Sequence, residues 1–266
     1  MDTRQFSNQI RKIILDKSYA AHVGHIGSGL SVADIMALLY ASVLRIHTPQ
    51  DPDRDRFVLS KGHAALALYA ALHLRGWITE EELHSFGTEF TLLGVHPEHK
   101  VMGIDFCTGS LGQGLTYGAG CALAARMQKS SRRTFVLMSD AECNEGSVWE
   151  AAMFSAQHKL SNLIVFLDLN GQQAMGYTSD IMDLSPMPAY WRTFGWDVHE
   201  VDGHDIPAME KIVSDLNISS GPPHIILAKT TFGKGVSFME KQIKWHYLPL
   251  SDNEYQQACA EVENNR

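Results

Sequence analysis

The sequence predicts an α/β fold in which a mostly parallel β-sheet carries helices on both faces. Short apolar runs rich in β-branched residues alternate with segments of helical periodicity, which is the pattern of such folds. The central stretch shows this most clearly, because apolar runs at residues 134–138 and 162–169 flank a helical segment at residues 146–160. A strand–helix–strand unit of this kind joins two parallel strands through a right-handed crossover.

The N-terminal region begins with a helix, expected over residues 3–21 because its apolar residues fall on one side. A loop is expected over residues 22–30, where three glycines within six residues disfavour a helix. Ser31 is a suitable N-cap for the next helix, expected over residues 32–44. A loop histidine such as His25 either faces solvent or contacts a ligand, and the local pattern leaves both interpretations open.

A strand over residues 56–60 and a helix over residues 64–75 follow, and His63 lies at their junction. Ligands bind at such junctions in α/β sheets, although a capping or packing histidine also suits the position. Thr79 begins a short helix with the capping-box pattern. A glycine-rich stretch over residues 107–115 then opens a helix of small residues. Glycine there lets a phosphate approach the backbone amides, or simply lets two helices pack closely.

The C-terminal region continues the alternation of helix and strand. A short helix leads into a strand over residues 196–201, and a helix is expected over residues 206–216. A buried strand over residues 224–229 follows, and a polar helix starts near Asp252 in a short C-terminal tail. The chain has 266 residues, of which 45% are hydrophobic, so we expect one domain over residues 1–266 with a substantial core.

Composition excludes several classes of protein. The net charge of −8, without a cluster of lysine and arginine, argues against nucleic-acid binding. No apolar run reaches 18 residues, so no membrane span is expected, and the N-terminus does not resemble a signal peptide. The four cysteines are scattered without a CxxC pair, which is typical of reduced thiols. We therefore expect a cytoplasmic protein.

Polar residues stand where the two central strands end. Asp140 follows the first strand and Asn170 follows the second. Ligands bind beyond the carboxyl ends of parallel strands, and a carboxylate, an amide oxygen and a loop carbonyl suit Mg²⁺ that also holds a diphosphate. Helix capping would explain the same two residue types, so the spacing alone leaves both interpretations open.

The stretch from Ser139-Asp140-Ala141-Glu142 to Asn170-Gly171 resembles the thiamine diphosphate motif of the transketolase family, which begins Gly-Asp-Gly and ends on Asn. The acidic and amide ligands match, whereas Ser139 and Ala141 replace the two glycines. Ala141 is the more serious departure, because glycine permits a positive φ and a close approach to a phosphate.

Further motifs of the family occur in the same order along the chain. They are Gly24-His25-Ile26-Gly27, Ser60-Lys61-Gly62-His63, Gly94-Val95-His96-Pro97, Thr108-Gly109-Ser110-Leu111-Gly112-Gln113-Gly114 and, more weakly, residues 233–240 with Trp245-His246. The resemblance implies the thiamine-diphosphate-binding fold, with the whole chain as the diphosphate-binding domain found at the N-terminus of transketolases.

The resemblance also implies roles for individual residues. The catalytic residues would be His25, His63, His96 and His246, which surround the diphosphate and the reacting sugar oxygens. The metal ligands would be the side chains of Asp140 and Asn170 and the backbone carbonyl of Gln172. The cofactor-binding residues would be His63, His96, Gly109, Ser110, Leu111, Asp140, Ala141, Glu142, Glu145, Asn170 and Gln172. Glu145 and Glu150 resemble acidic residues that face a partner subunit.

The implied function is that of one subunit of a two-chain, thiamine-dependent transketolase, which moves a two-carbon ketol unit from a ketose or ketose phosphate to an aldehyde. Its cofactors would be thiamine diphosphate and Mg²⁺, or Ca²⁺ or Mn²⁺ in its place. A full-length transketolase is more than twice as long, so we expect a dimer of heterodimers with a separate C-terminal, pyrimidine-binding subunit. Tyr247 stands where many full-length members of the family have glycine. This departure, together with those at Ser139 and Ala141, favours unusual-sugar or secondary-metabolite synthesis.

Two alternatives stay open at this point. One is another thiamine-dependent subunit, which would decarboxylate a 2-oxo acid or resemble deoxyxylulose phosphate synthase. The loop histidines favour a transketolase, because hydroxylated substrates need several hydrogen-bond donors and acceptors. The other is a non-catalytic relative that binds a partner and no cofactor, which the replaced glycines favour.

Overall fold

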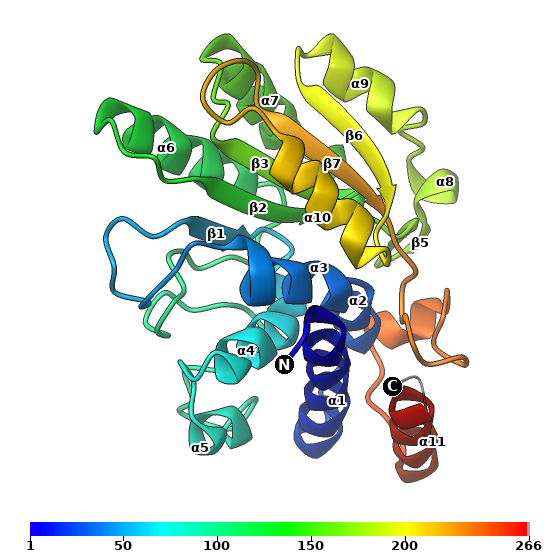
Figure 1. Ribbon diagram of the computed structural model, residues 1–266. Helices are drawn as coiled ribbons and strands as arrows, with labels where there is room; N and C mark the ends of the chain where they lie inside the picture. Colours follow the sequence, from blue (N-terminus) through cyan, green and yellow to red (C-terminus); the bar gives the residue numbers. More distant parts are fainter. Residues whose placement is uncertain (265–266) are drawn as a thin grey trace.

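The computed structural model describes residues 1–264, and in this part of the chain five parallel strands form one sheet. The strands follow the spatial order β1-β2-β3-β7-β6 (Figure 1). Their bounds are β1 Arg56–Leu59, β2 Thr134–Ser139, β3 Leu163–Leu169, β6 Asp197–Asp202 and β7 His224–Lys229. The α/β prediction with a parallel sheet is therefore confirmed.

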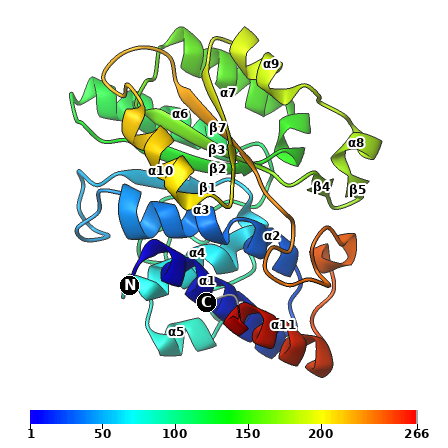
Figure 2. The same ribbon diagram turned by 45° about the vertical axis from the view of Figure 1, so that its right-hand side comes forward.

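Helices cover both faces of this sheet (Figures 1 and 2). One face carries α2 (Ile26–Ser31), α3 (Ala33–Leu38) and α10 (Ile206–Asp215), with α1 (Thr3–Ala21), α4 (Ala65–Leu74), α5 (Glu80–His84) and α11 (Asp252–Asn264) beyond them. The other face carries α6 (Gly114–Met127), α7 (Gly146–Gln157) and α9 (Met187–Thr193). The capping box at Thr79, predicted for the start of α5, is confirmed.

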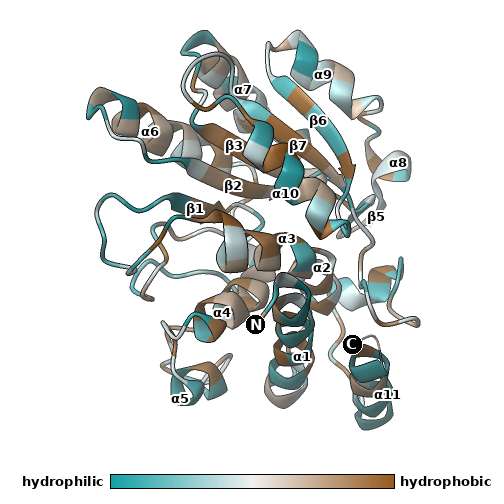
Figure 3. Ribbon diagram, viewed as in Figure 1, coloured by the Kyte–Doolittle hydropathy of each residue, from teal (hydrophilic) through white to brown (hydrophobic). Residues whose placement is uncertain are grey.

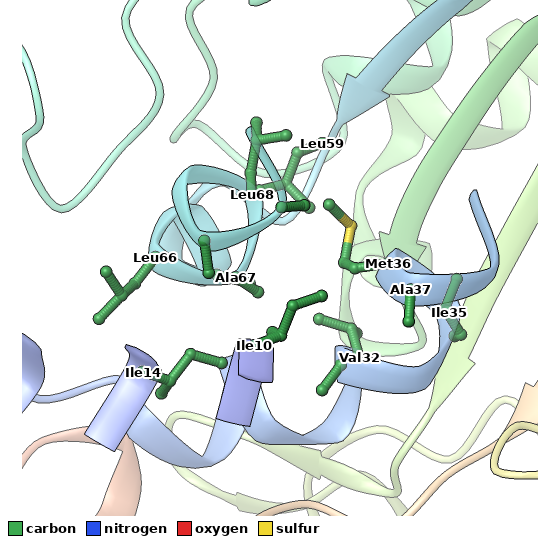
Figure 4. Close-up of a cluster of buried hydrophobic side chains, with 14 of the residues drawn as sticks. Ile10, Ile14, Val32, Ile35, Met36, Ala37, Leu59, Leu66, Ala67 and Leu68 are labelled. Carbon is green, nitrogen blue, oxygen red and sulfur yellow. The ribbon is translucent and has the colours of Figure 1, made fainter. Parts of the chain in front are cut away.

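The core divides into two clusters because successive side chains of a strand point to opposite faces. Phe135 and Phe166 pack with the helices on the α3 side, whereas Val136 and Val165 pack with those on the α6 side. The central strands are buried on both faces and are coloured mostly hydrophobic, whereas the edge strand β6 is partly hydrophilic (Figure 3). Figure 4 shows how α1, α3 and α4 interlock through apolar side chains that include Ile10, Met36 and Leu68.

The prediction of a loop over residues 22–30 is wrong, because α2 begins at Ile26 within it. Gly27 lies so close to Phe232 that a Cβ atom there would stand 2.1 Å from the aromatic ring. The glycine therefore permits tight packing of the helix, and this packing outweighs its low intrinsic helix propensity. Sequence patterns cannot reveal this contact, since more than two hundred residues separate its two partners.

The prediction that Ser31 caps the following helix is also wrong. The N-cap of α3 is Val32, and the Ser31 hydroxyl donates hydrogen bonds to the Ser28 carbonyl and to Asp168. The expected helix over residues 32–44 consists of α3 followed by a π-helical turn, Leu39–Val43.

Short elements surround the carboxyl ends of the strands. A two-stranded hairpin of β4 (Gln172–Gln173) and β5 (Gly176–Tyr177) follows β3 and leads into α8 (Thr178–Ile181). Three 3-10 turns, at Gly62–Ala64, Ala141–Asn144 and Ile243–His246, carry several of the residues singled out above. Across residues 1–264, none of the helices combines the length and the apolar character needed to cross a membrane.

Candidate active site

Asp140 and Asn170 lie at the tips of two neighbouring strands. Ser139, the last residue of β2, is the register partner of Asp168 on β3, so the residues that follow both strands lie side by side. The Asp140 carboxylate accepts hydrogen bonds from the backbone N–H groups of Gly171, at 2.8 Å, and Ala141, at 2.9 Å. The turn that begins at Asn170 is therefore held against the Asp140 carboxylate, as a shared metal site requires.

The turn after β3 has a defined geometry. Gly171 has a φ of +73°, a left-handed conformation that favours glycine. The Asn170 amide nitrogen donates to Asp168 at 2.9 Å, and its amide oxygen accepts from the Gln172 N–H at 2.9 Å. The Gln172 side chain is buried, and neither end of its amide has a hydrogen-bond partner within the described chain.

The electrostatics of Asp140 favour a bound cation. Burial, together with the nearby charge of Asp168, raises the pKa of Asp140 to about 7. A carboxylate that is costly to ionise in the bare protein is stabilised in its charged form by a divalent ion. A buried carboxylate, an amide oxygen and a backbone carbonyl are hard oxygen ligands, so the residues present fit a Mg²⁺-like ion.

Four histidines from distant segments gather beside these strand tips. The ring centroids of His25 and His63 are 5.6 Å apart, and those of His63 and His246 are 6.3 Å apart. The backbone N–H of His25 donates to the His246 carbonyl at 3.2 Å. The His96 ring packs over Gly109, where a Cβ atom would stand 3.2 Å from it. The predicted histidine cluster is therefore present as a spatial group.

Burial keeps these imidazoles in their neutral form. It lowers the pKa of His63 well below its usual value, and the Lys61 charge adds to the shift. Burial, Lys61 and His25 lower the pKa of His246 to about 4, and burial is also the main reason that the pKa values of His25 and His96 are lowered. Neutral imidazoles can donate to or accept from hydroxyl groups, so the cluster is chemically suited to proton transfer.

The glycine-rich loop over residues 107–113, which precedes α6, packs closely against the turn that carries His63. Gly62 packs against the backbone of Gly109. A Cβ atom added at Gly62 would lie 2.8 Å from the Gly109 amide nitrogen. Gly112 has a φ of +81° and lies against the Glu145 side chain. Of the other residues predicted in this region, Ser110 and Glu145 are exposed and Leu111 is half-buried.

Glu142 anchors the loop to the strand. Its carboxylate accepts from the Ser60 hydroxyl at 2.5 Å and from the backbone N–H groups of Gly112 and Ser139, each at 2.9 Å. The Glu142 carboxylate therefore bonds to groups of the protein itself and holds the glycine-rich loop against β1 and β2. We interpret it as a residue that positions this loop. Ala141 begins a 3-10 turn, a right-handed conformation that alanine adopts without strain, so this position does not need the positive φ that favours glycine.

Lys61 and Asp168 were not singled out from the sequence. Their side chains form a fully buried ion pair, and Asp168 also accepts hydrogen bonds from Ser31, Thr230 and Asn170. Asp168 thereby joins the ends of β1, β3 and β7 to α2. The sequence does carry one indication of this pair, because Asp168 stands inside an otherwise apolar strand. A buried charge there requires a partner of opposite charge.

Comparison with known proteins agrees with this geometry. Residues 2–263 match the family model described as "Transketolase, thiamine diphosphate binding domain". The chain is 40% identical over 258 residues to one of the subunits of the apulose-4-phosphate transketolase of Phocaeicola vulgatus, covering 96% of this chain and 92% of that protein. It is also 40% identical over 266 residues to 6-deoxy-6-sulfo-D-fructose transketolase subunit SqwG of a Clostridium species, covering 99% and 97% of the two chains.

The fold matches solved transketolases as well. The crystal structure of transketolase from Campylobacter jejuni superposes with a TM-score of 0.92 at 30% sequence identity. The match covers 98% of this chain and 42% of that one, so the chain spans about two fifths of the length of this solved relative. The chain therefore belongs to the transketolase family, a family of transferases, and corresponds to its thiamine diphosphate-binding domain.

Proposed function

We propose that this chain is the diphosphate- and metal-binding subunit of a two-chain transketolase that moves a two-carbon ketol unit from a ketose or ketose phosphate to an aldehyde. The observation that carries the proposal is the joint placement of Asp140, Asn170 and four neutral histidines at one edge of the sheet. Similarity to subunits named for apulose-4-phosphate and 6-deoxy-6-sulfo-D-fructose transketolases supports a sugar or sugar-phosphate donor.

The side chains of Asp140 and Asn170 and the backbone carbonyl of Gln172 would hold Mg²⁺, or Ca²⁺ or Mn²⁺ in its place, together with a diphosphate. Thiamine diphosphate, when bound, supplies the carbanion chemistry that breaks a carbon–carbon bond next to a carbonyl. His63 and His96, with the backbone of Gly109, Ser110 and Leu111, would contact the cofactor. Ala141 and Glu145 would lie at its edge, and Glu142 would hold the surrounding loops in place.

His25, His63, His96 and His246 would orient the substrate hydroxyls and carry protons to and from them. Their neutral state supports this role, because each ring then offers one donor and one acceptor nitrogen. The buried His25 Nδ1 and His246 Nε2 have no hydrogen-bond partner among residues 1–264, which leaves both atoms available to a ligand.

The partner would be a C-terminal, pyrimidine-binding subunit, and the assembly a dimer of heterodimers. Exposed apolar side chains support a docking surface for it. On α7, Met153 and Phe154 are exposed near Glu150. Beside the hairpin, Tyr177 and Tyr247 are also exposed. The Tyr177 hydroxyl donates to the Lys241 carbonyl, and the Tyr247 hydroxyl donates to the Ala174 carbonyl. Four cysteines without a disulfide in the described residues support a cytoplasmic location.

Isothermal calorimetry on the co-purified pair tests the proposal, with thiamine diphosphate titrated in the presence of Mg²⁺. We expect saturable binding that Asp140→Ala abolishes, whereas Asp215→Ala on the far end of α10 leaves it unchanged. The same pair is then given a panel of ketose phosphates and aldehydes. Ketol transfer is the expected reaction. Decarboxylation of pyruvate would instead identify another thiamine enzyme, and absence of cofactor binding would identify a cofactor-free relative.

A further inference from the structure

A second cluster of potential metal ligands lies at the amino ends of β6 and β7, the end of the sheet opposite to the active site. Asp197 is the register partner of His224, and His199 lies two residues further along β6. The three side chains therefore stand on one face of two paired strands. The Asp197 Oδ2 atom is 3.0 Å from the His199 Nε2 atom and 3.0 Å from the His224 Nδ1 atom. All three donor atoms lie within 4.8 Å of one another.

The contacts of His224 leave room for a bound cation at this point. Its ring is 2% exposed, and its Nε2 atom is 3.2 Å from the backbone carbonyl oxygen of Asn217. A carbonyl oxygen only accepts, so Nε2 must carry the proton. In the neutral ring Nδ1 then presents a lone pair to the Asp197 carboxylate, which is also an acceptor. Two acceptors at 3.0 Å repel each other unless a positive charge lies between them.

A metal ion meets this requirement with the geometry that proteins use. Metal-binding histidines usually donate their second ring N–H to a carboxylate or backbone carbonyl, which fixes the tautomer. The contact between His224 and Asn217 is such a bond. The ligands also stand on two hydrogen-bonded strands, whose register holds them in place before any ion arrives.

We propose that Asp197, His199 and His224 bind a divalent transition metal, with Zn²⁺ the best match. Two imidazole nitrogens and one carboxylate oxygen favour Zn²⁺ over Mg²⁺ or Ca²⁺, which prefer oxygen ligands only. The side chains of Asp197 and His199 are 44% and 29% exposed, so water completes the coordination on the open side. The ion would tie the edge strand β6 to β7 at a distance from the cofactor, and this proposal does not depend on the proposed function.

Two other places in the chain could also take up Zn²⁺, and the experiment must separate them. Glu98, His99 and Cys107 form a second group with ligand atoms close together, and the active-site carboxylate Asp140 is a third candidate. A Cys107→Ser background removes the sulfur ligand of the second group. Asp140→Asn removes the carboxylate of the third.

The test uses the full chain with Cys107→Ser and Asp140→Asn as the parent, stripped of metal by a chelator and titrated with Co²⁺ and then Zn²⁺. We expect a single equivalent of Co²⁺ to give visible bands of a nitrogen- and oxygen-ligated ion, and Zn²⁺ to displace it. His199→Gln and Asp197→Asn should weaken Zn²⁺ binding by about a hundredfold or more, since even outer-shell changes cost 10- to 100-fold. His47→Gln, at an exposed histidine elsewhere, should change nothing.

Thermal unfolding gives an independent readout. Zn²⁺ should raise the melting temperature of the parent and His47→Gln chains but not that of His199→Gln, because a ligand stabilises only the state that binds it. The proposal is wrong if the parent binds no Zn²⁺ under these conditions, or if both ligand variants bind as tightly as the parent.

Discussion

The Nζ atom of Lys61 and the Oδ2 atom of Asp168 form an ion pair in which neither side chain is exposed to solvent. Lys61 follows β1, whereas Asp168 lies near the end of β3 with β2 between them. The pair therefore ties together the strand ends that carry the candidate active site, and the Lys61 charge also lowers the pKa values of His63 and His246.

Removing Lys61 should destabilise the fold strongly, because Asp168 would be left as a buried charge without its cation. We expect Lys61→Met to lower the free energy of unfolding by about 3–5 kcal/mol. Adding Asp168→Asn should recover part of this loss, since the double variant no longer buries a charge. Urea unfolding of the parent, Lys61→Met, Asp168→Asn and the double variant measures both effects. Lys211→Met, which breaks an exposed pair with Asp215, serves as the control and should produce no measurable change.

Gln172 should show opposite effects on stability and on cofactor binding. Its buried amide has no hydrogen-bond partner within residues 1–264, and a buried unsatisfied polar group costs about 1–3 kcal/mol. Gln172→Leu should therefore raise the stability of the cofactor-free chain, as measured by urea unfolding. If the amide contacts the cofactor, the same variant should bind thiamine diphosphate more weakly in calorimetry. An unchanged affinity would contradict a cofactor contact for this side chain.

Two helical glycines should respond in opposite directions to alanine. Gly27 in α2 has no room for a Cβ atom beside Phe232, so Gly27→Ala should destabilise the chain by about 1–3 kcal/mol through overpacking. Gly120 in α6 has no atom within 4 Å of a Cβ position in the described structure. Gly120→Ala should therefore raise the free energy of unfolding by up to about 1 kcal/mol, because alanine is the better helix former. Denaturant titrations of the two variants compare them directly.

His246 should make the protein less stable in acid. Its pKa is lowered to about 4 in the folded chain, so the unfolded chain binds more protons below its usual pKa of about 6.5. Stability is then fully present above that value and falls as the pH decreases toward 4, by up to about 1.4 kcal/mol per pH unit for one group. His246→Gln should flatten this part of the profile, whereas the exposed His47→Gln should not. Urea titrations between pH 7.5 and pH 4 measure the slopes, and parallel profiles for parent and His246→Gln would contradict the assignment.

Local patterns predicted most of the fold. The buried runs of β2 and β3 and the capping box at Thr79 are encoded within a few residues, so they could be interpreted directly. The candidate site around Asp140, Asn170 and the four histidines was suggested instead by the resemblance of their motifs to those of transketolases. The helix α2 could not be predicted, because it depends on a contact between Gly27 and Phe232.

Long-range pairings also explain the features that the sequence did not reveal. Lys61 and Asp168 belong to different motifs, and their contact exists only once β1 and β3 are placed on either side of β2. Likewise, His224 meets Asp197 through the register of β6 with β7, which the chain does not specify locally. Strand register depends on the packing of the whole sheet.

The hydrogen bond between the His25 amide and the His246 carbonyl joins segments from near the two ends of the chain. During synthesis on the ribosome, the segment with His25 emerges long before its partner does. The histidine cluster is thus completed only after translation has passed residue 246, and we expect a nascent fragment that ends before this residue to lack the assembled cluster.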